Sequence, residues 1–178
     1  MNSNKVFPFL RLLVSLSIIF TGSSVFAETT FEKIKRTGKV TVGTEAAFPP
    51  FEFVEDGKIV GYGKDILDYI VADMNVELNQ LDLPWQGILP GVLAGKFDFV
   101  ATSVSIRAER AKKYAFTVPI AEGTNWVMKR SGDASINSPD DLSGKVVCTQ
   151  LASGSEKATK EWEEDMKSRG LKGFKELK

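Results

Sequence analysis

Strand-like and helix-like segments alternate along most of this chain, and this alternation restricts its fold more than any other feature. Short runs rich in β-branched and aromatic residues predict strands at 39–43, 76–83, 97–104, 124–129 and 145–150. Segments with apolar residues at helical spacing, or with helix start and stop residues, predict helices at 28–38, 65–74, 86–94, 108–114 and 156–167. Strands that alternate with helices favour an α/β fold with a largely parallel sheet.

Two interruptions of this pattern have their own structural meaning. Asp56-Gly57 separates strand-like residues 51–54 from 58–60, and this dipeptide is typical of a two-residue β-hairpin turn. Proline, glycine and a Ser-Gly-Asp sequence break the alternation within 117–132. Such residues favour loops and linkers, so we expect the boundary between two structural units there.

The N-terminus predicts export from the cytoplasm. Lys5 and Arg11 come before an apolar run at 12–20, with Arg11 directly adjacent to it. Val25-Phe26-Ala27 then places small residues at the −3 and −1 positions of a cleavage site. This order is typical of a secretory signal peptide covering residues 1–27, so we expect a periplasmic protein. An uncleaved N-terminal anchor is the alternative, although the apolar run is about half of the ~20 residues that a spanning helix needs.

Charge and composition exclude several classes of protein. The chain has 23 basic and 23 acidic residues, and the signal carries two of the basic ones, so the balance gives no reason to expect nucleic acid as a partner. Histidine is absent, which excludes Ser-His-Asp and Cys-His nucleophile systems and His-containing zinc motifs. The glycines at 91–95 and 61–63 fall short of phosphate-binding fingerprints, so we expect no cofactor and no metal.

Cys148 is the single cysteine, and we expect a buried thiol.

Three segments follow predicted strands and are therefore candidate binding loops, because ligands of open parallel sheets bind beyond the carboxyl ends of strands. They are residues 44–50, 101–110 and 150–156. In the second segment Ser103 and Ser105 leave a buried strand and Arg110 follows, a combination suited to a carboxylate. The alternative is a solvated helix face, because Arg110 belongs to a basic cluster with Arg107, Lys112 and Lys113.

The other candidates have equally ordinary alternatives. Ser153 opens a Ser-Gly-Ser-Glu sequence, which predicts a capping box or, with its free amides, an anion site. Phe48 and Trp85 each follow a predicted strand, and they either pack in the core or form the walls of a pocket. Glu45 is either a surface carboxylate or the partner of a cationic group.

Five segments together resemble a known family more specifically than any one motif does. They are VGTEAAFPPFEF at 42–53, WQGILP at 85–90, GKFD at 95–98, SVSIRAER at 103–110 and DLSGKVV at 141–147. In this order, across 31–168, they resemble the polar-amino-acid branch of the periplasmic solute-binding proteins that serve ABC importers. The resemblance implies a periplasmic-binding-protein-like α/β fold with two lobes of mostly parallel sheet, 28–120 forming the first lobe and 121–178 an incomplete second lobe. It implies a binding protein, not an enzyme, that delivers a free amino acid to a membrane permease.

The resemblance also implies roles for individual residues. Arg110 matches the arginine that pairs with the ligand α-carboxylate, and Ser153 stands where the second lobe completes that site. The remaining ligand contacts implied are hydrogen bonds from Ser103 and Ser105 and a side-chain pocket lined by Phe48 and Trp85.

Three departures from the family pattern weaken parts of this expectation. Gly63-Lys64 replaces an acidic and an apolar residue before the helix at 65–74. Ala152-Ser153-Gly154 replaces a Gly-Thr-Thr type of turn, so one hydroxyl contact is missing. The family pattern continues past the position of Lys178 with an acid for the ligand α-amino group, so we expect this chain by itself to bind amino acids weakly.

Other classes of function remain open at this point. Some periplasmic dehydratases of aromatic-acid biosynthesis resemble these binding proteins, and a shared fold does not decide function. The sensor lobe of a receptor and a non-functional fragment of a longer binding protein are further alternatives.

Overall fold

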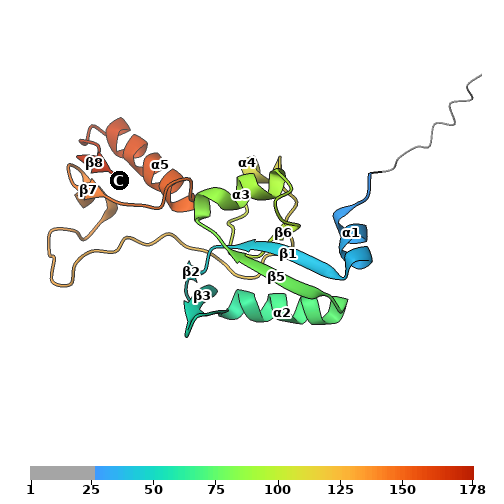
Figure 1. The fold of residues 1–178 in the computed structure, drawn as a ribbon. Coiled ribbons are helices and arrows are strands. Elements are labelled where there is room, and N and C mark those ends of the chain that lie inside the picture. Colours follow the sequence, from blue (N-terminus) through green and yellow to red (C-terminus); the bar gives the residue numbers. More distant parts are fainter. Residues whose placement is uncertain (1–26) are drawn as a thin grey trace, which may run out of the picture.

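The computed structural model describes residues 27–178, and Figure 1 shows how their elements are arranged. The predicted signal peptide lies outside the described residues except for Ala27. The helices are α1 Thr30–Thr37, α2 Tyr62–Met74, α3 Trp85–Leu93, α4 Ala108–Ala111, the 3-10 helix η1 Pro139–Leu142 and α5 Gly154–Ser168. The strands are β1 Lys39–Thr44, β2 Ala47–Phe48, β3 Glu52–Glu55, β4 Lys58–Val60, β5 Glu77–Asp82, β6 Phe99–Val100, β7 Val146–Val147 and β8 Glu176–Leu177.

A parallel sheet in the order β5-β1-β6 confirms the predicted α/β class. β1 pairs with β5 in register from Lys39–Glu77 to Thr44–Asp82, and β6 extends the other edge. Helix α2 covers one face of this sheet and α3 the other (Figure 1). The side chain of Val42 in β1 is buried, as expected for a strand that is covered on both faces.

Phe97 fixes how closely α3 approaches the sheet. Its ring lies between two glycines, Gly43 in β1 and Gly91 in α3. A Cβ atom at Gly43 would lie 2.7 Å from the Phe97 ring, and one at Gly91 would lie 2.6 Å from it. Only glycine leaves room for this ring on both sides, and the buried aromatic area then holds helix and sheet together.

The predicted hairpin is present as β3 and β4, which are antiparallel neighbours. Asp56 and Gly57 at its turn both have positive φ, 50° and 72°. Two successive residues with positive φ define the type of turn that matches the twist of the strands, which is why Asp-Gly predicted it. The short strand β2 pairs with β3 and completes this second sheet.

The last part of the described chain forms a smaller group of elements around α5 (Figure 1, red). β7 and β8 are parallel, and Leu142 and Met166 are buried in this group. Arg169 at the end of α5 forms an ion pair with Asp140 of η1 at 2.6 Å, which ties the two helices together. The proposed division into lobes at 28–120 and 121–178 stays a prediction.

Several predicted elements are shorter than expected, and one is wrong. Residues 124–129 contain no strand: Trp126 is 84% and Met128 96% exposed, and no strand within residues 27–178 pairs with this segment. An apolar sequence cannot form a strand without a neighbour to complete its hydrogen bonds. The strands predicted at 97–104 and 145–150 and the helix predicted at 108–114 shrink to β6, β7 and α4.

Cys148 is exposed, which corrects the expectation of a buried thiol. It follows the two-residue strand β7, whose sheet has only one neighbouring strand, so too little structure surrounds it to cover the side chain. Among residues 27–178, no helix combines the length and apolar character that a membrane crossing requires.

Candidate functional site

The candidate site lies where the carboxyl end of the central sheet meets the start of α5. Arg110 on α4 and Trp85 at the start of α3 are in direct contact, with the Arg110 Cζ atom 5.5 Å from the centroid of the Trp85 ring. The Arg110 guanidinium donates hydrogen bonds to the carbonyls of Ser105, at 3.1 Å, and Ala152, at 3.4 Å. The fold thus brings Trp85, Ser105, Arg110 and the turn that contains Ser153 together.

Arg110 is a half-buried cation without an acidic partner. Within residues 27–178 it forms no ion pair with any Asp or Glu side chain. Burial and, after it, the charge of Arg107 hold the pKa of Arg110 below its usual range. Both effects disfavour the charged guanidinium, and the charge of a bound anion would offset them.

Ser103 is held in place by a buried carboxylate that sequence reasoning missed. Glu52 in β3 is only 2% exposed. Its side chain accepts hydrogen bonds from the Thr102 hydroxyl at 2.8 Å, from the Ser103 amide at 2.5 Å and from the Ser103 hydroxyl at 3.0 Å. Glu52 therefore fixes the segment between β6 and α4. In the sequence, the only sign that Glu52 is buried is its position between two phenylalanines in a strand.

Phe48 belongs to a group of three aromatic rings. Its ring is 53% exposed and stacks on Phe51 at a centroid distance of 5.6 Å. Phe51 in turn meets Tyr62 edge-on at 6.1 Å. Trp85, by contrast, is 8% exposed and packs in the core with one face toward Arg110. The prediction that Phe48 and Trp85 line a side-chain pocket stays a prediction.

Ser153 is the N-cap residue of α5. Its hydroxyl accepts a hydrogen bond from the Glu156 amide at 3.0 Å. The Glu156 carboxylate accepts from the Ala152 amide at 2.6 Å instead of from the Ser153 amide, so only half of the predicted capping box forms. Ala152 has a positive φ of 60°, and this turn of the backbone directs its amide toward Glu156.

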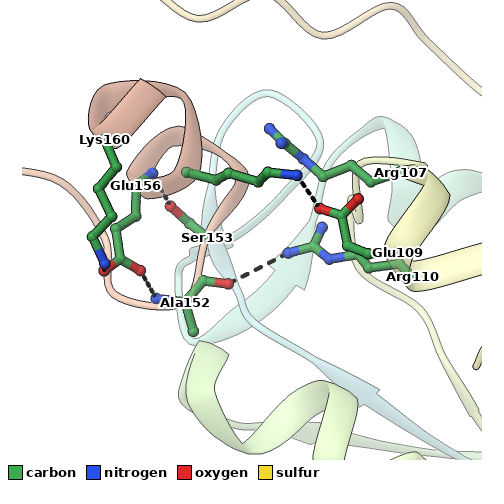
Figure 2. Close-up of a pocket in the computed structure, with 8 residues that line it drawn as sticks. Arg107, Glu109, Arg110, Ala152, Ser153, Glu156 and Lys160 are labelled. Carbon is green, nitrogen blue, oxygen red and sulfur yellow. Dashed lines mark hydrogen bonds and ion pairs between the residues drawn. The ribbon is translucent and has the colours of Figure 1, made fainter. Parts of the chain in front are cut away.

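A pocket of about 350 Å³ opens between α4 and the first turns of α5. Figure 2 shows that Arg107 and Arg110 reach it from one side and Ser153 and Glu156 from the other. We call it the α4–α5 pocket. Both lysines that line it are neutralised, since Lys157 pairs with Glu109 at 2.8 Å and Lys160 pairs with Glu156 at 2.6 Å. The two arginines have no such partner within the described residues, so the pocket favours anions.

One further contact links the two sides of the site. Gln150, after β7, donates from its side-chain amide to the Glu45 carboxylate at 2.7 Å. Burial raises the pKa of Glu45, and the hydrogen bond from Gln150 opposes that shift. Across residues 27–178, no group of His, Cys, Asp or Glu side chains is positioned to hold a metal ion.

Comparison with known proteins identifies the family. Residues 40–177 match the bacterial extracellular solute-binding proteins, family 3. The chain therefore belongs to this family, and the predicted resemblance is confirmed.

Individual relatives show how much of such a protein this chain represents. It is 32% identical over 126 residues to the L-cystine-binding protein TcyJ of Escherichia coli K12, an alignment that covers 70% of this chain and 47% of that protein. It is 26% identical over 167 residues to a probable amino-acid ABC transporter-binding protein of Haemophilus influenzae, covering 90% of this chain and 62% of the relative. The chain thus spans about half to three-fifths of the length of these relatives.

A solved structure with the same fold supports this assignment. The ancestral amino acid-binding protein AncCDT-1, a precursor of cyclohexadienyl dehydratase, superposes with a TM-score of 0.69 at 32% identity, covering 75% of this chain and 61% of that one. The α/β fold of periplasmic amino-acid-binding proteins, predicted from the sequence, is confirmed.

Proposed function

We propose that this protein binds a free amino acid outside the cytoplasm and delivers it to the permease of an ABC importer, with Arg110 holding the ligand α-carboxylate. The observation that carries the proposal is the placement of Arg110: half-buried, against Trp85, beside the α5 N-terminal turn, and without an acidic partner in the described chain.

The chemistry of this placement favours a carboxylate. A guanidinium has five N–H donors, and Arg110 uses two hydrogen bonds to backbone carbonyls, so donors remain for a ligand. The planar fork matches both oxygens of a carboxylate, whereas a chloride or a single hydroxyl would use only part of it. Ser153 at the start of α5 adds the positive end of a helix to the same pocket.

The names of the relatives support an amino acid as the ligand and a permease as the partner. One relative is an L-cystine-binding protein and another a probable amino-acid ABC transporter-binding protein. We infer the same class of role for this chain, and a periplasmic location that follows from the predicted signal peptide. Ser103, Ser105, Phe48 and Trp85 are proposed as additional ligand contacts.

A dehydratase-type enzyme is the second candidate, and one observation bears on it. The similar ancestral structure is described as the precursor of a dehydratase, yet it is itself described as an amino acid-binding protein. The binding function is therefore the one this similarity favours.

A thermal-shift screen of residues 28–178 against each proteinogenic amino acid tests the proposal. A ligand that binds only the folded state stabilises it, by about 2.7 kcal/mol at a concentration of 100 Kd. We expect one amino acid, or a few chemically similar ones, to raise Tm at millimolar concentration, while the corresponding amine without the α-carboxylate does not. Because this chain by itself is expected to bind weakly, each amino acid is screened up to its solubility limit, and failure of every one to raise Tm even there would refute the proposal.

A further inference from the structure

Arg107 contacts both sides of the candidate site, although the sequence assigned it no role beyond a basic cluster. It is the N-cap residue of α4, and its carbonyl accepts a hydrogen bond from the Arg110 amide at 3.0 Å. Its guanidinium Nη2 donates to the carbonyl of Gly154, the first residue of α5, at 2.7 Å. Figure 2 shows the Arg107 and Arg110 side chains projecting from α4 toward the same pocket.

The Arg107 side chain is held in a specific and costly position. Its Nε atom is shielded from solvent and has no hydrogen-bond partner among the described residues. A buried donor without a partner destabilises a structure. The contact with Gly154 must therefore compensate for it, which distinguishes Arg107 from the exposed lysines of the same basic cluster.

Gly154 provides the space that this contact needs. A Cβ atom at position 154 would lie 2.7 Å from Arg107 Nη2 and 3.1 Å from its Nε. Apart from the adjacent residues and the backbone of α5 itself, the three nearest neighbours of this Cβ atom all belong to the Arg107 side chain. A methyl group here would therefore displace the guanidinium and leave the rest of the turn unobstructed.

We propose that Arg107 is a positioning residue that holds the Ser153–Gly154 turn beside Arg110, and that glycine at 154 leaves room for the guanidinium to lie against its backbone. The inference deepens the proposed function and rests on it where ligand affinity is concerned. It also accounts for the glycine in Ala152-Ser153-Gly154, because a side chain at 154 would have to displace the Arg107 guanidinium.

Four variants of residues 28–178 test the pairing of Arg107 with Gly154. Three of them are Arg107→Met, Gly154→Ala and the combination of the two. The fourth is a control protein that carries the same types of substitution elsewhere, Lys112→Met together with Gly87→Ala. Lys112 ends α4 with an exposed side chain, and a Cβ at Gly87 in α3 meets nothing within 4 Å. The first measurement is hydrogen exchange of the Glu156 amide, which is bonded to the Ser153 hydroxyl at 3.0 Å.

Each single change should lower the protection of the Glu156 amide roughly fivefold, the factor expected for loss of a helix cap. The two effects should not add. Once Arg107 is methionine, alanine at 154 should be neutral or increase protection, because alanine favours helices over glycine. Additive effects, or an Arg107→Met variant equal to the control, would overturn the pairing.

The second measurement is affinity for a mixture of the proteinogenic L-amino acids, monitored at the Trp85 indole N–H. We expect Arg107→Met and Gly154→Ala to weaken binding about tenfold, or by 1.4 kcal/mol, with the controls unchanged. Lost amide protection with unchanged affinity would overturn the positioning role. If the unmodified protein binds no amino acid, the proposed function fails, whereas the exchange data still decide whether Arg107 and Gly154 are paired.

Discussion

Glu45 is a carboxylate at the site, and its surroundings disfavour the ionised form of its side chain. It follows β1 and receives a hydrogen bond from Gln150 at 2.7 Å. Burial raises its pKa above the ordinary value of 4.5, and the hydrogen bond only partly offsets burial. Because its pKa is higher in the folded protein than in the unfolded chain, the folded state favours the protonated side chain. Its contribution to stability is therefore complete below pH 4.5 and lost as the pH rises through the folded pKa.

This predicts that Glu45→Gln stabilises the protein at neutral pH. Glutamine keeps an oxygen that accepts from Gln150 and never ionises. The free energy of unfolding should exceed that of the unmodified protein at neutral pH, and the two should converge below pH 4.5. Urea unfolding across this pH range measures it, with Glu55→Gln, an exposed carboxylate on β3, as the control. A difference that does not depend on pH would contradict the explanation.

Helix α5 enters the site through its N-terminal turn, and Ser153 has two possible roles there. Its hydroxyl caps the helix by accepting from the Glu156 amide. The family resemblance implies that the same hydroxyl contacts the ligand. Glycine is nearly as good an N-cap as serine, whereas alanine is poor, so the two substitutions separate these roles.

We predict that Ser153→Ala lowers the free energy of unfolding by about 0.5–2 kcal/mol and Ser153→Gly by only a few tenths. If the hydroxyl contacts the ligand, both variants should lose amino-acid affinity equally. Denaturant unfolding and ligand titration of the two proteins give the answer. Ser153→Gly with unchanged affinity would reduce Ser153 to a helix cap.

Local sequence signals predicted the elements that depend on local chemistry. The Asp56-Gly57 dipeptide predicted the hairpin because these residue types tolerate the positive φ that its turn requires, and the apolar residues of 39–43 identified the central strand β1. The strand predicted at 124–129 is wrong because a strand also needs a partner strand, and the residues of the segment itself do not reveal whether one is present. A helix cap can be predicted from sequence because the cap residue lies within a few residues of the helix. A strand partner is harder to predict because it can lie anywhere in the chain.

The same distinction applies to the site. Arg110, Ser105 and Trp85 were candidates because each follows a strand, and the fold brings them together. Glu52 and Arg107 were missed because their partners, Ser103 and Gly154, lie 51 and 47 positions away in the sequence. For Phe48 the structure shows a neighbour that the sequence did not indicate, because one face of its ring stacks on Phe51.

At the scale of the whole molecule, the proposed function requires export. We predict cleavage after Ala27, because Val25-Phe26-Ala27 provides small residues at the positions that signal peptidase recognises. Intact-mass measurement of the protein from periplasmic extract should give a chain that starts at Glu28, and Ala27→Leu should prevent processing. A periplasmic protein that retains Met1 would contradict this prediction.

The central claim is that Arg110 holds the ligand carboxylate, and the Trp85 indole N–H is the most direct probe of it. Trp85 lies 5.5 Å from the Arg110 Cζ atom, whereas Trp126 is 84% exposed and serves as an internal reference. The measurement is an NMR titration of residues 28–178, unmodified and with Arg110→Ala or Arg110→Lys, using the amino acid that raises Tm most.

Loss of one partner of a buried charge pair costs about 2–5 kcal/mol. The account predicts that the Trp85 signal shifts and saturates in the unmodified protein, that Arg110→Ala abolishes the response, and that Arg110→Lys restores little of it because the planar fork is lost. An Arg110→Ala protein that binds within about threefold of the unmodified one, a difference of less than 1 kcal/mol, would contradict it.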